Sequence, residues 1–299
     1  MDITHIKTLL LAIFLFFLPS AHQEVDLSLV PLQPNSSQST QIRPEQAPEP
    51  TQPQQEQTPE VTQEPVSGPP NTKLYILMYH EVVEDGVRCN DWMTTTSQLR
   101  EDFQWLADHG YTTLLPSEVV RMSEAGTLPK RAVLVTFDDG YASNLKLALP
   151  ILEDTHTRAV VSIITERIDA GDPGFLTWDM CRELDASPLV EIGSHTHTLH
   201  GTGEGIKRQK GESEAEYKAR VLPDLQTSID LIEENLGAKP RFLAYPHGIA
   251  DPWAEDFLRE NFDMTVTTKH GCADIAQGLY DLRRINVNTR ETAKKFLPD

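Results

Sequence analysis

Two adjacent aspartates, Asp138 and Asp139, end the mostly apolar run of residues 132–137. A continuous apolar run with β-branched members is typical of a strand buried on both faces of a parallel sheet. Two carboxylates side by side at the end of such a strand repel each other and are costly to desolvate. The pair becomes favourable if a cation binds one carboxylate and the other acts as a base. The alternative is a strand followed by an ordinary Asp-Gly turn.

Three histidines, His195, His197 and His200, lie within six residues of one another, just after the apolar run 189–192. Neutral imidazole is the usual nitrogen ligand of zinc and related divalent metals. Two histidines and one carboxylate leave coordination positions open for water and substrate, as a catalytic metal site requires. A lone histidine is more often an ordinary core or surface residue. Three on one short loop, in a chain with ten histidines, favour a metal site.

Short apolar runs alternate with amphipathic helices from about residue 73 to the C-terminus. This alternation predicts an α/β fold with a mostly parallel sheet, and the number of strands favours a closed or nearly closed barrel. The predicted strands are 74–78, 132–137, 159–164, 189–192, 241–245, 264–267 and 284–287. The predicted helices are 97–109, 117–124, 142–152, 177–186, 213–236 and 252–261.

Barrels of this kind carry their chemistry at the carboxyl ends of the strands. Two further strand ends therefore become candidates. His80 follows strand 74–78, and a Tyr-Pro-His-Gly loop, residues 245–248, follows strand 241–244.

Composition narrows the classes of partner. The chain has 26 basic and 45 acidic residues, a formal charge of −19, which argues against nucleic acid and anionic membranes as partners.

The three cysteines, Cys89, Cys181 and Cys272, show no CxxC spacing and do not resemble a metal cluster. We expect them to be small buried residues.

The first 72 residues differ from the rest. Residues 8–19 are apolar but short for a membrane span, so we predict that residues 1–21 are a signal peptide or an N-terminal membrane anchor. Residues 31–70 contain 19 Gln or Pro, which predicts a disordered linker over 22–72. The catalytic domain is then 73–299. We expect an exported protein, either periplasmic, membrane-anchored or extracellular, that meets a membrane only through an uncleaved N-terminal segment.

Three motifs together resemble a known family. TFDDGY at 136–141, SHTHTLH at 194–200 and the Tyr-Pro-x-Gly loop at 245–248 are similar to the polysaccharide deacetylases of carbohydrate esterase family four. The resemblance covers essentially all of residues 73–299. It implies a deformed (β/α) barrel with a divalent metal, which we expect to be zinc, bound by an Asp-His-His set. The metal polarises an acetamide carbonyl and activates a water, and the products are acetate and a free amine.

The resemblance also implies roles for single residues. Asp139 is the expected carboxylate ligand of the metal, and Asp138 is the expected base. His195 is the expected first histidine ligand. The second is His200, five residues later, a spacing similar to that of the branch that deacetylates poly-N-acetylglucosamine; His197 is the alternative.

Further residues are predicted to contact the substrate or to tune the base. By analogy, the main-chain N–H of His247 stabilises the oxyanion, with Tyr245 beside it, and Trp178 forms a wall of the sugar site. Where the family has an arginine two residues before the loop proline, this chain has Ala244. We therefore predict that Arg284, or its neighbour Arg283, supplies the cation that pairs with the base.

The general acid is the last predicted role. In most of the family it is a histidine after the final strand, but residues 288–291 contain none. The first and last strands of a closed barrel are neighbours, so His80 can occupy the same place in space, as in the permuted poly-N-acetylglucosamine branch. An imidazole with a pKa near neutrality suits the task. The alternative is His270, within a sequence typical of a turn.

Three functions remain open at this point. The first is an N-deacetylase acting on an acetylated polysaccharide, most simply an N-acetylglucosamine polymer. The second is an O-acetyl esterase or a peptidoglycan-directed deacetylase with the same catalytic set. The third is a catalytically weak carbohydrate-binding protein. The presence of all four of Asp138, Asp139, His195 and His200 argues against it, because a binding protein does not need them. We expect a monomer.

Overall fold

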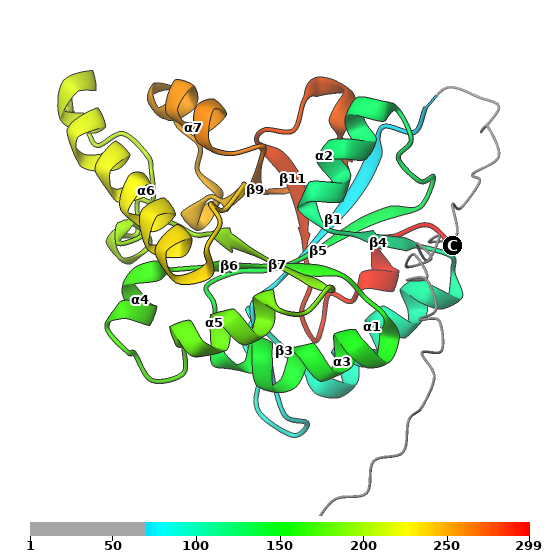
Figure 1. Cartoon of the computed structure of the whole chain (residues 1–299). Coiled ribbons are helices and arrows are strands. Elements are labelled where there is room, and N and C mark those ends of the chain that lie inside the picture. The colour runs from blue at the N-terminus through cyan, green and yellow to red at the C-terminus, as the bar shows by residue number, and fades with distance from the viewer. Residues whose placement is uncertain (1–69) are drawn as a thin grey trace, which may run out of the picture. The chain divides into compact units, whose positions relative to one another are not determined.

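The computed structural model describes residues 70–299, and in them one sheet of nine strands carries the fold (Figure 1). Seven parallel strands close into a barrel in the order β1-β11-β9-β8-β7-β6-β5, and β5 pairs back onto β1. These strands are β1 (Lys73–Tyr79), β5 (Ala132–Phe137), β6 (Ala159–Ile163), β7 (Val190–Ser194), β8 (Phe242–Ala244), β9 (Met264–His270) and β11 (Leu282–Asn286). The predicted barrel is confirmed, and the predicted signal or anchor segment lies outside the described residues.

Two short strands extend the barrel. β4 (Thr112–Leu114) pairs in parallel with β5, and β10 (Ala273–Asp274) pairs antiparallel with β1. A separate two-stranded sheet, β2 (Glu81–Val83) and β3 (Met93–Thr95), lies directly after β1 in the chain. None of these four was predicted, because strands of two or three residues show no periodicity to detect.

Helices surround the strands in Figure 1. They are α1 (Thr96–Asp108), α2 (Pro116–Ala125), α3 (Leu149–Thr155), α4 (Thr165–Asp169), α5 (Trp178–Asp185), α6 (Glu214–Leu236) and α7 (Glu255–Asn261). The helix predicted over 142–152 instead begins with a wider π-helical turn, Asn144–Ala148, before α3. Pro150 in the first turn of α3 has no N–H to donate, which interrupts a regular α-helix at this point.

The strands bury both faces. In β5, Val133 and Val135 pack in one cluster with apolar residues of α1 and α3, while Leu134 packs in a second cluster with residues of β8 and β9. All six residues of β5 are buried. This two-sided burial explains why the strand has no alternating polar positions.

The long helix α6 has clear ends. The Ser213 side chain accepts a hydrogen bond from the Glu216 N–H, and the Glu216 side chain accepts one from the Ser213 N–H. This capping box satisfies two main-chain donors at the start of the helix. Gly237 ends the helix in the left-handed conformation, with φ 82°.

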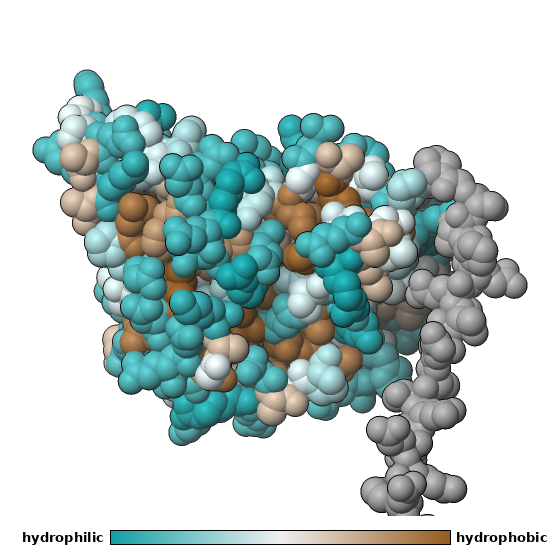
Figure 2. Space-filling model, turned by 45° about the horizontal axis from the view of Figure 1, so that its top comes forward, coloured by the Kyte–Doolittle hydropathy of each residue, from teal (hydrophilic) through white to brown (hydrophobic). Residues whose placement is uncertain are grey.

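The surface is mainly polar. Figure 2 shows hydrophilic residues over most of the face it presents, with hydrophobic residues visible in patches between them. Among residues 70–299, no helix combines the length and the apolar character needed to cross a membrane. Cys181 is buried, as expected, but Cys89 and Cys272 are only partly buried, and all three are free thiols.

Candidate active site

The carboxyl ends of four barrel strands, β1, β5, β7 and β8, surround a cavity of about 320 Å³. Parallel strands place these ends at one edge of the barrel, so the polar residues that follow them meet there. Seven of the predicted site residues line the cavity: His80, Asp138, Asp139, His195, His200, Tyr245 and His247.

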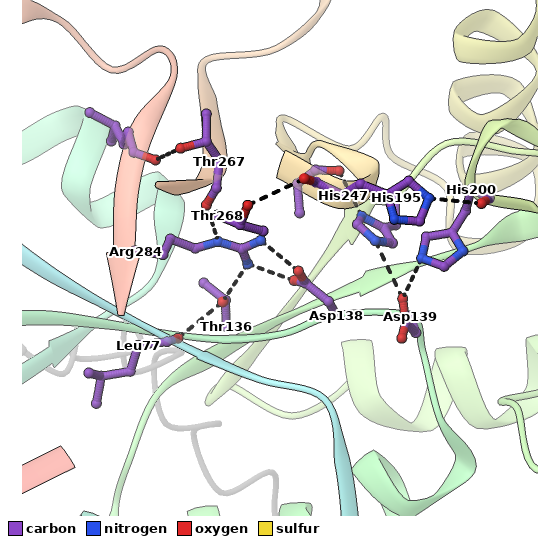
Figure 3. A network of polar contacts seen from close by, with 12 residues as sticks. Leu77, Thr136, Asp138, Asp139, His195, His200, His247, Thr267, Thr268 and Arg284 are labelled. Carbon is purple, nitrogen blue, oxygen red and sulfur yellow. Dashed lines mark hydrogen bonds and ion pairs between the residues drawn. The ribbon is translucent and has the colours of Figure 1, made fainter. Parts of the chain in front are cut away.

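Asp139, His195 and His200 form a group that could hold a metal ion. Asp139 Oδ1 lies 3.4 Å from His195 Nε2 and 3.3 Å from His200 Nε2 (Figure 3). The potential ligand atoms all lie within 4.8 Å of one another. Asp139 Oδ1 is buried and has no partner at hydrogen-bond geometry within residues 70–299. An acceptor facing two imidazole nitrogens, with no donor of its own, fits a divalent cation.

The orientation of His195 is fixed by the main chain. Its Nδ1 lies 2.7 Å from the carbonyl oxygen of Ala244, which can only accept a hydrogen bond. Nδ1 must therefore carry the proton, and in the neutral ring Nε2 presents its lone pair towards Asp139. A hydrogen bond of this kind is the usual way in which proteins fix the tautomer of a metal-binding histidine.

The loop between the two histidines is held by α6. Asp224 Oδ1 accepts a hydrogen bond from the His197 N–H at 3.0 Å, and Oδ2 accepts from the N–H and the hydroxyl of Thr198, at 2.8 and 2.6 Å. The His197 ring does not join the metal-binding group, because its Nδ1 lies 3.0 Å from the hydroxyl of Thr165. His200, and not His197, thus lies beside Asp139.

Asp138 forms a two-point ion pair with Arg284 of β11. Arg284 Nη1 lies 2.8 Å from Oδ1, and Nη2 lies 2.6 Å from Oδ2 (Figure 3). Arg284 also donates from Nε to the Thr267 carbonyl, and its side chain is fully buried. Its neighbour Arg283 instead donates to the His270 carbonyl at the surface. Of the two predicted arginines, the structure therefore pairs Arg284 with Asp138.

His80 directly follows β1 and lies beside the end of β11, since Leu77 and Met78 pair with Ile285 and Asn286. Its Nδ1 is buried and has no hydrogen-bond partner among residues 70–299. His270, the alternative acid, ends β9 instead of lying in a turn. It is exposed, packs against Phe296, and does not line the cavity.

The loop after β8 contributes His247 at the rim. His247 has a left-handed main chain, φ 57°, and its Nε2 lies 3.1 Å from the carbonyl oxygen of His200. Gly248 also has a positive φ, and a Cβ there would lie 2.1 Å from the Thr268 hydroxyl, so only glycine fits. The Tyr245 hydroxyl is buried and donates to Thr265.

Comparisons with known proteins agree with this architecture. A sequence model of the family described as "Polysaccharide deacetylase" matches residues 125–264. The Bacillus subtilis (strain 168) protein YxkH, whose name assigns it to the polysaccharide deacetylases, is 30% identical over 229 residues, which cover 75% of each chain. The chain belongs to the polysaccharide deacetylase family. This membership confirms the predicted family and its enzyme class.

One further relative and one solved structure show which enzymes of the family this chain is similar to. The poly-beta-1,6-N-acetyl-D-glucosamine N-deacetylase of Escherichia coli (strain K12) is 27% identical over 258 residues, covering 76% of this chain and 38% of the relative. The chain thus spans about two fifths of the length of that relative. The structure of a de-N-acetylase from Aggregatibacter actinomycetemcomitans matches with a TM-score of 0.65 and 28% identity, covering 75% of this chain and 100% of the other.

One predicted residue lies elsewhere in this deacetylase. Trp178 begins α5 and does not line the cavity; its indole N–H donates to Asp169 at 2.8 Å, and its ring packs on the apolar cluster outside the barrel. The tryptophan that does line the cavity is Trp92, in the loop before β3. Sequence reasoning missed it because the flanking strands are too short to predict.

Burial and neighbouring charges set the protonation of the site. Burial alone would raise the pKa of Asp138, but Arg284 holds it below its usual value. Burial alone would also raise the pKa of Asp139. His195 and the other nearby histidines outweigh it and hold this pKa well below the usual range. Burial, together with the charge of His195, lowers the pKa of His200 to about 4. Both carboxylates are therefore ionised and His200 is neutral at neutral pH. At His195 the lowering by burial is outweighed by Asp139 and Asp138, which raise its pKa, so a metal would bind its Nε2 in exchange for a proton.

Proposed function

We propose that this protein removes N-acetyl groups from an acetylated polysaccharide that contains N-acetylglucosamine. The observation that carries the proposal is the meeting, in one cavity, of the Asp139-His195-His200 group and the Arg284-paired carboxylate Asp138. The similarity to proteins named poly-beta-1,6-N-acetyl-D-glucosamine N-deacetylases supports the choice of bond and sugar.

In this proposal Asp139, His195 and His200 are the ligands of a divalent metal, for which zinc is the first candidate because two imidazoles and one carboxylate suit it. When bound, such a metal polarises the acetyl carbonyl and brings the pKa of a bound water towards neutrality. The hydrogen bond from His195 Nδ1 to Ala244 keeps Nε2 free as the ligand atom.

Asp138 is the proposed base. Arg284 keeps its carboxylate ionised and fixes its orientation through two hydrogen bonds, so the side chain does not need to reorganise to accept a proton. It takes a proton from the water that attacks the acetyl carbon. The main-chain N–H of His247 is the proposed donor to the resulting oxyanion.

His80 is the proposed acid. When the carbon–nitrogen bond breaks, the leaving sugar amine needs a proton, and the products are acetate and a glucosamine unit. His80 lines the same cavity as Asp138, and its buried Nδ1 has no hydrogen-bond partner among the residues that the structure describes. Burial lowers the pKa of His80, so its protonated form is a stronger acid than a free imidazolium.

The N-terminal sequence supports a location. We propose that the protein is exported and acts on polysaccharide outside the cytoplasm, on the basis of the apolar segment 8–19 and the Gln/Pro-rich segment that follows it. We also propose that it acts as a monomer. We propose no nucleic-acid partner, because the formal charge is −19.

Acetate release from a panel of substrates tests the function. The panel contains N-acetylglucosamine oligomers, peptidoglycan fragments and O-acetylated xylan. Release from the N-acetylglucosamine oligomers is expected. Preferred release from xylan would make the protein an ester hydrolase, and no release from any substrate by the zinc-loaded protein would overturn the proposed activity.

Metal content tests the ligand set separately. The purified protein is expected to hold about one zinc ion, and His200→Ala is expected to lose it, while His197→Ala is the matched control from the same loop and keeps it. Full zinc occupancy in His200→Ala would overturn the ligand assignment.

A further inference from the structure

One side of the cavity is formed by the short sheet β2–β3 and the loop that connects its strands. Glu81 of β2, Met93 of β3 and the loop residues Asn90 and Trp92 line the cavity here. The Trp92 side chain is 51% exposed. Among residues 70–299, the only other large hydrophobic residue with comparable exposure is Val87, at 48%, in the same loop but outside the cavity.

The main chain around Trp92 is fixed from several directions. The Trp92 carbonyl accepts a hydrogen bond from the Glu81 N–H at 3.2 Å, and the Trp92 N–H donates to Asn90 Oδ1 at 2.8 Å. The carbonyl of Asp91 accepts from Asn288 Nδ2 at 3.1 Å, almost 200 residues away in the chain. The main chain therefore fixes the position of an indole that is exposed to solvent. Exposed apolar surface does not stabilise the folded state, so stability does not explain this placement.

Trp92 lies next to the proposed chemistry. Its ring centroid is 4.8 Å from that of His80, and the two rings meet edge to face at 64°. His80 shares the cavity with Asp138 and Asp139. The indole is thus partly covered by His80 and otherwise open, beside the place where the leaving amine must lie.

We propose that Trp92 is a stacking surface for a pyranose ring of the polysaccharide, beside the sugar unit that loses its acetyl group. The C–H face of a pyranose is apolar, and covering an exposed indole with it removes apolar surface from both partners. Polar groups on the rim of an aromatic surface then orient the sugar through its hydroxyls. This subsite deepens the proposed function and rests on it for the class of ligand.

The neighbouring polar groups suit a sugar. Glu81 and Asn90 line the cavity next to Trp92, and Glu81 forms no ion pair within the described part of the chain. Its carboxylate can accept hydrogen bonds from hydroxyls or from the ammonium of a unit already deacetylated. An anionic ligand would be repelled at this wall, since Glu81 is one negative charge in a chain of net charge −19.

Equilibrium binding tests the subsite without turnover. Zinc-loaded Asp138→Asn protein is titrated with an N-acetylglucosamine pentamer in a calorimeter, with Trp92→Ala, Trp92→Phe or Val87→Ala added. Trp92→Ala is expected to weaken binding about tenfold, the scale of one aromatic stacking contact, and Trp92→Phe less than that. Val87→Ala, from the same loop, is expected to bind as the Asp138→Asn parent does. Equal affinity for Trp92→Ala and its parent would overturn the proposal.

Kinetics separate this role from an effect through His80. With Asp138 intact, Trp92→Ala is expected to raise KM for the pentamer more than it lowers kcat, while Val87→Ala, outside the cavity, is expected to leave both values unchanged. A fall in kcat at constant KM would overturn the subsite and make Trp92 a positioning residue for His80. Pentamer binding without turnover by the wild-type protein would overturn the proposed function but keep the subsite, and absence of both would overturn both.

Discussion

The two neighbouring carboxylates of the site differ in their partners. Figure 3 shows Asp138 bonded to Arg284, whereas Asp139 faces His195 and His200. We use floor for Asp138, which lines the cavity, together with the buried residues behind it, Arg284, Thr136 and Thr267. In the floor both carboxylate oxygens of Asp138 have guanidinium partners. We use rim for the other side chains around the proposed metal and acid: His80, Asp139, His195, His200 and His247. At the rim, Asp139 Oδ1 and His80 Nδ1 are buried without a hydrogen-bond partner in the described part of the chain.

Nearly all buried polar atoms in folded proteins are paired, so each unpaired one needs a reason. For Asp139 Oδ1 and His80 Nδ1, which both belong to residues that line the cavity, that reason is a ligand. The floor is completed by the protein itself, which fixes the charge and direction of Asp138 before any substrate arrives. The rim is complete only with a ligand. Variants of the floor should therefore affect both folding and turnover, whereas variants of the rim should affect binding and turnover alone.

Asp138→Asn is expected to have the largest effect on the reaction. The amide keeps the size of the carboxylate but cannot accept a proton, so turnover should fall on the order of a thousandfold. Zinc content should stay near the parent value, because Asp138 is not in the ligand group. Initial rates of acetate release and metal analysis of the same preparations measure both. Retained turnover would remove Asp138 from the role of base.

Arg284→Met should have the largest effect on folding. It leaves a buried carboxylate without its cation, and breaking a buried pair in this way costs about 3–5 kcal/mol of unfolding free energy. Arg283→Met is the matched control, because that side chain lies at the surface, and should change stability by less than about 0.5 kcal/mol. Urea unfolding of the three proteins compares them; similar midpoints for all would show that the floor is not a structural unit.

Another buried carboxylate, Asp102, has no cationic partner among residues 70–299 and shows what Arg284 contributes to the floor. It accepts hydrogen bonds from the Tyr79 hydroxyl, the Ala293 N–H and the Gln98 side chain. Burial raises its pKa to about 6. The folded state therefore binds more protons than the unfolded state between about pH 4 and pH 6, and the contribution of Asp102 to stability falls as pH rises through that range.

Asp102→Asn should remove this part of the pH dependence. The change amounts to on the order of 3 kcal/mol at most, from the shift of about two pKa units. Unfolding free energies at pH 4.5 and pH 7 in the parent, in Asp102→Asn and in the exposed control Asp108→Asn measure it. The prediction fails if the parent and Asp102→Asn lose the same stability between the two pH values.

His80→Ala tests the rim. We expect turnover to fall on the order of a hundredfold, the usual scale for loss of one acid–base group, with zinc content and stability unchanged. Added imidazole should restore part of the rate, which a purely structural role would not permit. His270→Ala, at the exposed end of β9, is the control. An inactive His270→Ala with a fully active His80→Ala would return the acid to the conventional end of the chain.

Local pattern was enough to predict which strand ends meet. The apolar runs before His80, Asp138 and His195 could be recognised one by one, and parallel pairing then brings their carboxyl ends together. The resemblance to the family chose His200 over His197, and the structure places His200 beside Asp139.

The contacts that support the site were harder to predict. Arg284 and Asp138 lie 146 residues apart in the chain, and nothing local distinguishes Arg284 from Arg283. Trp178 was predicted at the sugar site by analogy with the family, and its place at the start of a helix is instead that of a core residue. Trp92 was not predicted, because β2 and β3 on either side of its loop have three residues each. Asp224 shows no signal either, since it is one of several acidic residues on α6.

The smallest expected effect concerns Asp224, which holds the rim loop from outside the cavity. In Asp224→Asn the amide nitrogen cannot accept a hydrogen bond, so the contacts to Thr198 at Oδ2 are lost while the one to the His197 N–H remains possible. The loop then holds His195 and His200 less firmly, and the affinity for zinc should fall about tenfold, the lower end of the range for groups that orient metal ligands. Competition with a chelator measures the dissociation constant.

Asp230→Asn is the control for Asp224→Asn, because Asp230 lies on the same helix and bonds Gln226 at the surface. If Asp224→Asn unfolds at lower urea concentration but binds zinc as tightly as the control, Asp224 stabilises the fold without ordering the rim, and the rim loop holds its own shape.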